Sequence, residues 1–370
     1  TIFNSANMGI LGPKLSGLTL YEGTKPNDTY KAESNLDAGY LMVDNIFDKW
    51  RLVWGARLEN FSQHLISKYD SGIDVNVDVT QLDILPSLNI IYSLTKKQNL
   101  RLSASKTLNR PEFRELAPFQ FYDNATGRQR EGNPDLKVTE IINGDLRYEF
   151  FPGKAQLFSV SAFYKDFKNP IEIQAQANNS DKYINAKSGT NYGMEIEYRT
   201  LASSIFGSEN TKFLEDLTLF TNLSIIRSKV DISNVVTSAN VEDTPMQGQS
   251  PYVFNAGLQY LNKELGWSFS ANMNKIGNRI AIHGNQVQGD ENPAFWEKSR
   301  ILLDLQLAKF FLKDKLEFRF NVQNLLAQDL DFYQNNDLTG TEEIKGFKAF
   351  VNKVFTGDSQ NKNGYNSQED

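Results

Sequence analysis

Residues 98–168 alternate apolar and polar side chains, interrupt this pattern over a polar stretch, and then resume it. At the start of the segment, Leu100 and Leu102 point one way while Arg101 between them points the other. A period of two is the period of a β-strand, because successive side chains of a strand point to opposite faces. The segment therefore predicts long strands joined by a short turn at one end and by the polar loop 109–136 at the other.

The rest of the chain repeats this unit, with short and long connections in turn. We expect about twelve strands, at residues 30–47, 50–59, 79–94, 98–108, 137–151, 155–168, 183–203, 217–228, 254–260, 267–274, 301–307 and 316–326. The long connections are expected to be polar loops, at residues 69–78, 109–136, 170–182, 229–250, 283–298 and 327–370. Pro86 lies inside the third strand and predicts a bulge or a weakly paired site, because proline cannot donate to a strand ladder.

No apolar run in the sequence approaches the length of about 18 residues that marks a membrane-spanning helix. Short turns at one end with long loops at the other are typical of an up-and-down transmembrane barrel made of strands. Trp50, Trp54 and Trp267 lie near strand ends beside the short turns, where an aromatic girdle would meet the membrane surface. We therefore predict an all-β fold, an antiparallel up-and-down transmembrane β-barrel. Alternation alone also fits a soluble sheet with one buried face.

Composition and motifs argue against several classes of function. The net charge of -6 argues against a nucleic-acid-binding protein, and the lack of cysteine excludes disulfide and thiolate chemistry. No hydrolase, zinc-protease or phosphate-binding motif occurs in the sequence. The two histidines, His64 and His283, are far apart and belong to no motif, so we expect them at solvated or girdle positions. We expect no enzymatic activity, no metal site and no cofactor.

Three stretches of the sequence closely resemble the C-terminal barrel of TonB-dependent outer-membrane receptors, in the variety common among Bacteroidetes. They are residues 107–116, with the letters TLNRPEFREL, residues 132–137, with GNPDLK, and residues 163–167, with FYKDF. The Asn-Pro-Asp-Leu-Lys stretch that opens a strand, with an Arg-Pro pair upstream, is the most specific of these signals. The resemblance extends over nearly all of the chain.

This resemblance implies a barrel of about 22 strands, plugged by an N-terminal domain, of which about twelve strands lie in this chain. It implies that residues 1–29 end an extracellular loop, that residues 30–326 form the membrane-spanning strands, and that residues 327–370 form the last extracellular loop, with the final strand absent. It also implies location in the outer membrane, contact with its lipid, and active uptake of a small nutrient, which is a siderophore, cobalamin, peptide or glycan. The TonB–ExbB–ExbD complex would act through the missing plug. The alternative is a structural or secretion-associated outer-membrane barrel that does not transport.

Aromatic and arginine side chains gather in the long loops, and such side chains are the usual anchors of a recognition surface. The candidate ligand-binding residues are Phe119, Phe121, Tyr122, Arg128, Arg130 and Trp296. Packing of the loops against one another would explain the same residues equally well. If the loop 109–136 reaches toward a ligand, removal of residues 119–122 should weaken binding without the loss of any strand hydrogen bond. Charged residues on the polar strand faces, such as Arg101 and Glu197, are expected to bond the plug or one another.

Overall fold

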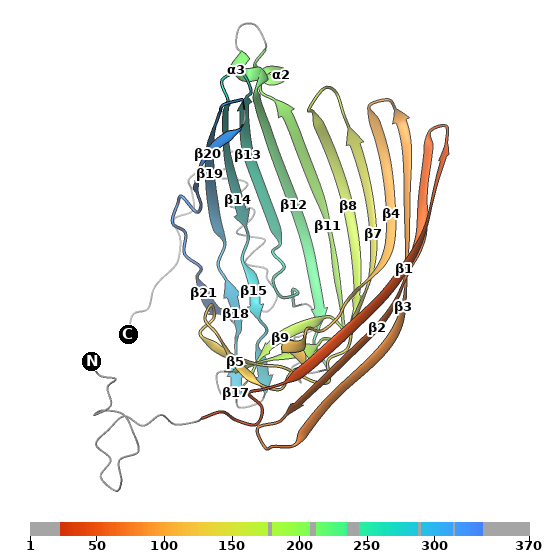
Figure 1. Cartoon of the computed structure of the whole chain (residues 1–370), viewed down its shortest axis with the longest axis vertical. Helices are drawn as coiled ribbons and strands as arrows, with labels where there is room; N and C mark the ends of the chain where they lie inside the picture. Colours follow the sequence, from red (N-terminus) through yellow and green to blue (C-terminus); the bar gives the residue numbers. More distant parts are fainter. Residues whose placement is uncertain are drawn as a thin grey trace, which may run out of the picture.

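The chain passes up and down through one antiparallel sheet of twelve strands (Figure 1). The computed structural model describes residues 23–176, 180–207, 212–234, 244–287, 290–313 and 315–335. Across the sheet the order is β1 (Lys31–Phe47), β2 (Trp50–Lys68), β3 (Asp74–Thr95), β4 (Gln98–Asn109), β7 (Thr139–Phe150), β8 (Leu157–Lys168), β11 (Ser188–Leu201), β12 (Leu217–Asp231), β13 (Tyr252–Asn262), β14 (Trp267–Ile276), β19 (Arg300–Phe311) and β20 (Leu316–Val322). We call the end of the sheet with the short connections the turn end and the opposite end the loop end.

This sheet confirms the all-β, antiparallel prediction and the expected count of about twelve strands. Among the described residues β1 pairs only with β2, and β20 only with β19, so these two strands are its edges. A closed barrel of about 22 strands therefore stays a prediction. The assignment of both chain ends to extracellular loops also stays a prediction, and residues 1–22 and 336–370 lie outside the described residues.

Secondary structure occurs in the long connections, where the sequence predicted polar loops. At the loop end, a four-stranded sheet has the order β5 (Gln120–Asp123), β6 (Arg128–Glu131), β10 (Ser180–Asn185) and β9 (Ile171–Ala175). A second small sheet contains β15 (Arg279–Ile282), β18 (Ala294–Glu297) and β21 (Phe332–Asn335), and a third contains β16 (Asn285–Val287) and β17 (Asp290–Asn292). Helix α1 (Phe113–Leu116) follows β4, while α2 (Ser203–Phe206) and α3 (Lys212–Glu215) lie between β11 and β12 at the turn end (Figure 1).

Several strand boundaries differ from the prediction, and two of them concern the loop end. β3 begins at Asp74, so the loop predicted at residues 69–78 is shorter and the β2–β3 hairpin is longer. Val75 and Val77 in this extension are buried, and the exposed polar residues that alternate with them concealed the strand in the sequence. The strand predicted at residues 183–203 is divided, because Tyr183 belongs to β10 and β11 begins only at Ser188.

The structure separates the two alternatives that Pro86 left open. Pro86 pairs in regular register with Ala56 of β2, so no bulge occurs at this proline. β3 pairs with β4 only from Ser87 onward, and the register shift lies between Ser93 and Thr95 instead. Pro86 is thus a weakly paired site, at the point where β3 departs from β4.

Each long strand separates an apolar face from a polar face. On the apolar face Leu102, Ile196 and Phe318 have exposed fractions of 48%, 42% and 63%, as a lipid-facing surface requires. On the polar face, Arg147 pairs with Glu197 at 2.8 Å, so these charged side chains bond one another across the strands. The facing predicted from the alternation is confirmed for Leu102.

We expect an arginine on the apolar face to destabilise the sheet in a membrane. Ile196→Arg should lower the free energy of unfolding by about 2–4 kcal/mol, because a cation near the middle of the bilayer loses its hydration. Ser161→Arg is the matched control, since Ser161 lies on the polar face between Arg147 and Glu195 in the register. Urea unfolding of the protein in phospholipid vesicles measures both values, and equal losses would contradict the assignment of the faces.

Candidate ligand-binding site at the loop end

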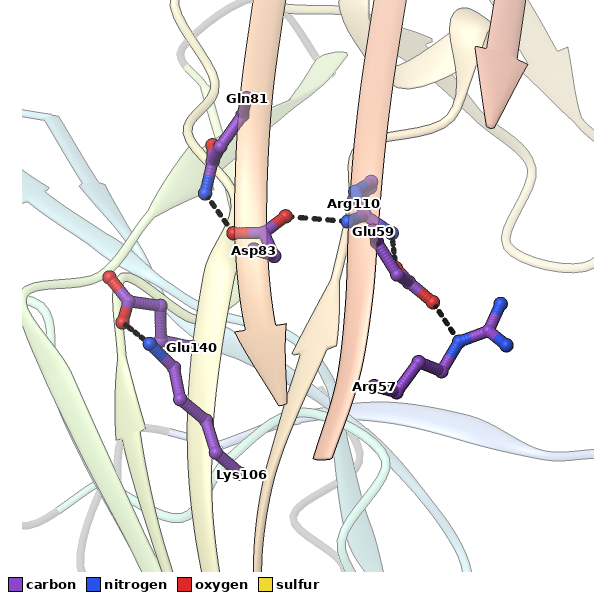
Figure 2. Close-up of polar contacts among 7 residues, drawn as sticks. All are labelled: Arg57, Glu59, Gln81, Asp83, Lys106, Arg110 and Glu140. Carbon is purple, nitrogen blue, oxygen red and sulfur yellow. Dashed lines mark hydrogen bonds and ion pairs between the residues drawn. The ribbon is translucent and has the colours of Figure 1, made fainter. Parts of the chain in front are cut away.

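The loop after β4 begins with an arginine that binds two carboxylates at once. Arg110 pairs with Glu59 of β2 at 2.8 Å and with Asp83 of β3 at 2.6 Å (Figure 2). All three side chains are largely buried. A guanidinium suits this place because its planar fork presents several donors in fixed directions. The group also lies 4.5 Å from the ring centre of Phe61. Arg110 therefore fixes the start of the loop to the polar face of β2 and β3.

Each of these two carboxylates has a further partner on its own strand (Figure 2). Arg57 bonds Glu59 at 2.6 Å, and Gln81 donates to Asp83. Glu59 and Asp83 are direct partners across the β2–β3 ladder. Like charges directly opposite each other are destabilising in a sheet, so the pair depends on the shared cation of Arg110.

A second ion pair in Figure 2 marks where the apolar face of the sheet ends. Lys106 of β4 binds Glu140 of β7 at 2.6 Å, and Lys168 of β8 binds the same carboxylate at 3.1 Å. By register Lys106 is opposite the exposed Ile142, so this cluster is on the apolar face. Charges are costly in the middle of the bilayer and tolerated at its surface. On β4, β7 and β8 the apolar face therefore becomes charged at this level.

The Gly-Asn-Pro stretch returns the loop to the sheet. A Cβ added to Gly132 would meet the carbonyl oxygen of Ala117 at 2.0 Å, so this close approach requires glycine. The backbone N–H of Asn133 donates to the carbonyl of Glu115 at 2.6 Å, and its side chain donates to the carbonyl of Tyr183 at 3.0 Å. The most specific motif of the sequence thus closes the loop on itself and on β10.

A hydrophobic cluster joins this loop to the extended hairpin of β2 and β3. Its buried members are Leu65, Val75, Val77, Leu116, Ala117 and Leu136. The predicted site residue Phe119 packs against the cluster and is partly buried. Its ring centre also lies 5.8 Å from that of Phe121, a second predicted site residue. Phe119 therefore supports the fold of the loop.

The hairpin of β5 and β6 has two different faces. Phe121 and Arg130 are register partners on one face, where Arg130 pairs with Asp123 at 2.9 Å and the guanidinium of Arg114 lies 4.7 Å from the Phe121 ring centre. The predicted site residue Tyr122 is on the opposite face and has an exposed fraction of 61%. The hairpin thus directs one face to the protein and the other to solvent.

Arg128 is buried in an ion pair with Asp181 of β10, with an Nε–Oδ1 distance of 2.7 Å. It also donates to the carbonyl of Ser180 at 2.9 Å and lies 4.6 Å from the ring centre of Phe295 in β18. Burial raises the pKa of the Asp181 carboxyl, and the Arg128 guanidinium opposes that rise. The predicted site residue Arg128 therefore joins the four-stranded sheet to the neighbouring three-stranded one.

Trp296 is buried in the three-stranded sheet, with an exposed fraction of 3%. It packs with Ile280 and Ala294, and Tyr333 covers the same cluster. Its indole Nε1 has no hydrogen-bond partner among the residues that the structure describes. Trp296 lies next to Phe295, which contacts Arg128. This contact joins the three-stranded sheet to the four-stranded sheet, so all six predicted residues belong to one assembly of loops.

One buried pair in this assembly was not predicted from the sequence. His283 Nε2 lies 2.9 Å from Glu172 Oε2, and their side chains have exposed fractions of 1% and 2%. The backbone N–H of Gln247 donates to the same carboxylate oxygen at 2.9 Å. The expectation of a solvated or girdle position for His283 was therefore wrong, because three connections far apart in sequence enclose it. No motif in the sequence indicates this contact.

Comparison with known proteins identifies the family. Residues 4–325 match the family model described as TonB dependent receptor-like, beta-barrel. This chain belongs to that family. The curated "Iron-regulated outer membrane virulence protein" of Vibrio cholerae serotype O1 is 24% identical over 298 residues, which are 77% of this chain and 39% of that protein. Membership of this receptor family confirms the predicted location in the outer membrane.

Two solved structures share the fold of this TonB-dependent receptor chain. The unliganded ferric citrate transporter FecA aligns with a TM-score of 0.54 and 17% identity, over 83% of this chain and 43% of its own. The ferric-catecholate import receptor Fiu from K12 E. coli aligns with a TM-score of 0.53 and 17% identity, over 81% of this chain and 42% of its own. The chain therefore spans less than half the length of each of these three relatives. Among its described residues, no helix is long and apolar enough to cross a membrane.

One expectation about the receptor loop has to be corrected. Removal of residues 119–122 would take away three of the four residues of β5, all of which pair with β6. It would also remove Phe119 from the hydrophobic cluster. The deletion therefore costs strand hydrogen bonds and cannot separate binding from folding. Whether any of the six residues binds a ligand stays a prediction, which only a substitution on the exposed face tests cleanly.

We expect Arg110→Ala to release the loop 110–136 from the β2–β3 hairpin, because Glu59 and Asp83 lose the cation they share. Limited proteolysis of the receptor should then cut within this loop about tenfold faster, which corresponds to a loss of about 1.4 kcal/mol of docking free energy. Arg51→Ala is the control, since Arg51 forms an exposed pair with Asp44 near the turn end. Unchanged cleavage of Arg110→Ala would show that the ion pairs do not hold the loop.

Proposed function

We propose that this chain is the barrel part of a TonB-dependent receptor that imports a ferric complex, with a ferric siderophore or a related chelate as the class of ligand. The family match carries the proposal, and the descriptions of all three relatives named above concern iron. Cobalamin, peptide and glycan, which the sequence left open, receive no such support. The resemblance to the Bacteroidetes variety of these receptors stays a prediction from the sequence motifs.

The loop assembly supports the proposal through the side chains that remain available to a ligand. Ferric chelates with catecholate or carboxylate groups are anionic and partly planar, so they suit aromatic rings and guanidinium groups. Tyr122 is exposed on the outer face of the β5–β6 hairpin. Arg114 is an exposed residue of the same loop, and its guanidinium lies against the Phe121 ring on the other face of the hairpin. Arg128 and Trp296 are already committed to internal contacts. We therefore assign first contact with the ligand to Tyr122 and Arg114.

Energy for the transport would come from the TonB–ExbB–ExbD complex through a plug domain in the barrel. The polar face of the sheet supports this part of the proposal because it presents charged and amide side chains where a plug would lie. Glu195 accepts from Ser224 at 3.2 Å, and Asn274 donates to Asn255 at 2.7 Å. Such a wall, polar and internally bonded, suits contact with a folded and hydrated plug.

Iron uptake by cells that depend on this receptor tests the function directly. We expect radioactive iron to accumulate when it is offered as a catecholate or citrate complex and to stop when a protonophore collapses the inner-membrane gradient. Labelled cobalamin, offered in the same way, is the control for ligand class. Uptake of no iron complex, with normal insertion of the receptor, would reject the proposal and favour the non-transporting barrel.

A substitution on the exposed face tests the assigned residues. We expect Tyr122→Ala to weaken binding of the ferric complex by about tenfold, because one exposed aromatic anchor is worth roughly 1–2 kcal/mol at an interface. Tyr69→Ala is the matched control, since Tyr69 is an exposed tyrosine in the β2–β3 connection at the same end of the sheet. Quenching of intrinsic fluorescence gives both affinities. Equal affinity of the two variants would place the ligand elsewhere in the loop assembly.

A further inference from the structure

The two small sheets at the loop end continue into one another through the residue that follows β15. The backbone N–H of Ala175 in β9 donates to the carbonyl of His283 at 2.8 Å, and the N–H of His283 donates to the carbonyl of Ile173 at 2.8 Å. The side chains of Ile173, Ala175 and Ile282 form one buried cluster across this junction. Figure 1 shows β5, β9, β15 and β18 gathered at the loop end. We call the combined sheet, with the order β5, β6, β10, β9, β15, β18 and β21, the loop sheet.

Gln247, in the connection between β12 and β13, binds both halves of the loop sheet. Its side-chain carbonyl accepts from the backbone N–H of Ile173 in β9 at 3.0 Å, and its side-chain amide donates to the carbonyl of Ala281 in β15 at 2.7 Å. Its backbone N–H donates to the carboxylate of Glu172 at 2.9 Å, and the same carboxylate oxygen is hydrogen-bonded to His283 Nε2. A further connection is therefore fastened at the point where the two halves meet.

We call Glu172, Gln247 and His283 the joint. The side chains of Glu172 and His283 have exposed fractions of 2% and 1%, so water has almost no access to them. If the two halves of the loop sheet separated, this buried carboxylate and this buried imidazole would both lose their partner, which is strongly unfavourable. The apolar cluster around Ile282 would be exposed as well. The joint therefore holds the two halves together as one body.

The loop sheet unites connections that are far apart in the sequence. Its strands come from the connections that follow β4, β8, β14 and β20, and Gln247 adds the connection that follows β12. Tyr122, to which we assign first contact with the ligand, is in β5 at one edge, and β21 forms the other edge.

We propose that these five connections respond to the ligand as a single lid and not loop by loop. In this lid the joint transmits any displacement of the β5–β6 hairpin to β18 and β21, because strands that are bonded edge to edge form a rigid path between distant sites. The coupling to ligand rests on the proposed function, whereas the rigidity of the lid rests only on the contacts at the joint.

Distances between pairs of spin labels test the rigidity of the lid without any ligand. The sequence contains no cysteine, so Asn124→Cys in the β5–β6 turn and Gln334→Cys in β21 carry the only labels within this chain. Both residues are exposed, and they lie at opposite edges of the loop sheet. In the full receptor we expect a narrow distribution of the distance between these two labels.

Substitutions at the joint show whether it causes this rigidity. We expect His283→Ala to widen the distribution several-fold, because Glu172 loses a buried partner. His283→Gln should keep the distribution narrow, since a glutamine side chain can still form a hydrogen bond with Glu172. Lys298→Ala is the matched control, because the exposed pair of Lys298 with Asp331 lies beside β18 and β21, within one half of the loop sheet. A wide distribution with the joint intact, or a narrow one in His283→Ala, would overturn the proposal.

Addition of ferric citrate or a ferric catecholate complex tests the coupling. A label at Lys96→Cys, in the β3–β4 turn at the turn end, is the fixed reference. We expect the complex to shift the distances from Lys96 to Asn124 and from Lys96 to Gln334 together, while the distance between Asn124 and Gln334 stays unchanged. In His283→Ala only the distance to Asn124 should shift. A shift of one edge alone with the joint intact, or no shift with the complex bound, would overturn the single lid. Failure of every iron complex to bind would instead reject the proposed function, and the distances without ligand would still decide whether the lid is one body.

Discussion

A strand that crosses hydrocarbon must have its backbone N–H and C=O groups bonded on both sides, because no water is present to replace a missing partner. The ten inner strands of the twelve-stranded sheet meet this condition through their two neighbours. The edge strands β1 and β20 meet it on one side only among the described residues. In a membrane their free edges need partners as well, from further strands or from closure. This requirement explains why the sheet is a regular meander with long strands and short turns.

Where strands leave the membrane, water can bond their backbone groups, so a strand no longer needs a partner on both sides. The pairing of the sheet changes at that point. β3 separates from β4 at Pro86, beyond which the polar face of β2 and β3 is free to receive a loop. Charged groups can be buried at this level because each finds a partner, as Arg110 does with Glu59 and Asp83. The loop end is therefore held by specific ion pairs and one hydrophobic cluster, whereas the spanning part is held by its ladder.

This difference explains what the sequence could predict. Alternation is a local signal, so it located the twelve strands of the large sheet from short stretches of chain. It failed for the short strands at the loop end. Residues 128–131 read Arg-Gln-Arg-Glu and show no apolar period, and β6 exists because Arg128 meets Asp181 in a distant part of the chain. The composition of the loops identified the candidate assembly, but Phe121 and Tyr122 face opposite ways only because of a register that the sequence does not reveal.

The same residue types build the loops and recognise ligands, so composition cannot distinguish the two roles. The two roles can be distinguished by whether each side chain already has a bonding partner within the protein. A ligand that used Arg128 would have to compete with a buried carboxylate and would leave Asp181 without its cation, which is strongly unfavourable. A ligand that met Tyr122 would displace only water, and one that met Arg114 would compete with no more than its contact with the Phe121 ring. Binding at the exposed face therefore costs least, and the buried arginines act indirectly, because they hold the β5–β6 hairpin in the one orientation that presents Tyr122 outward.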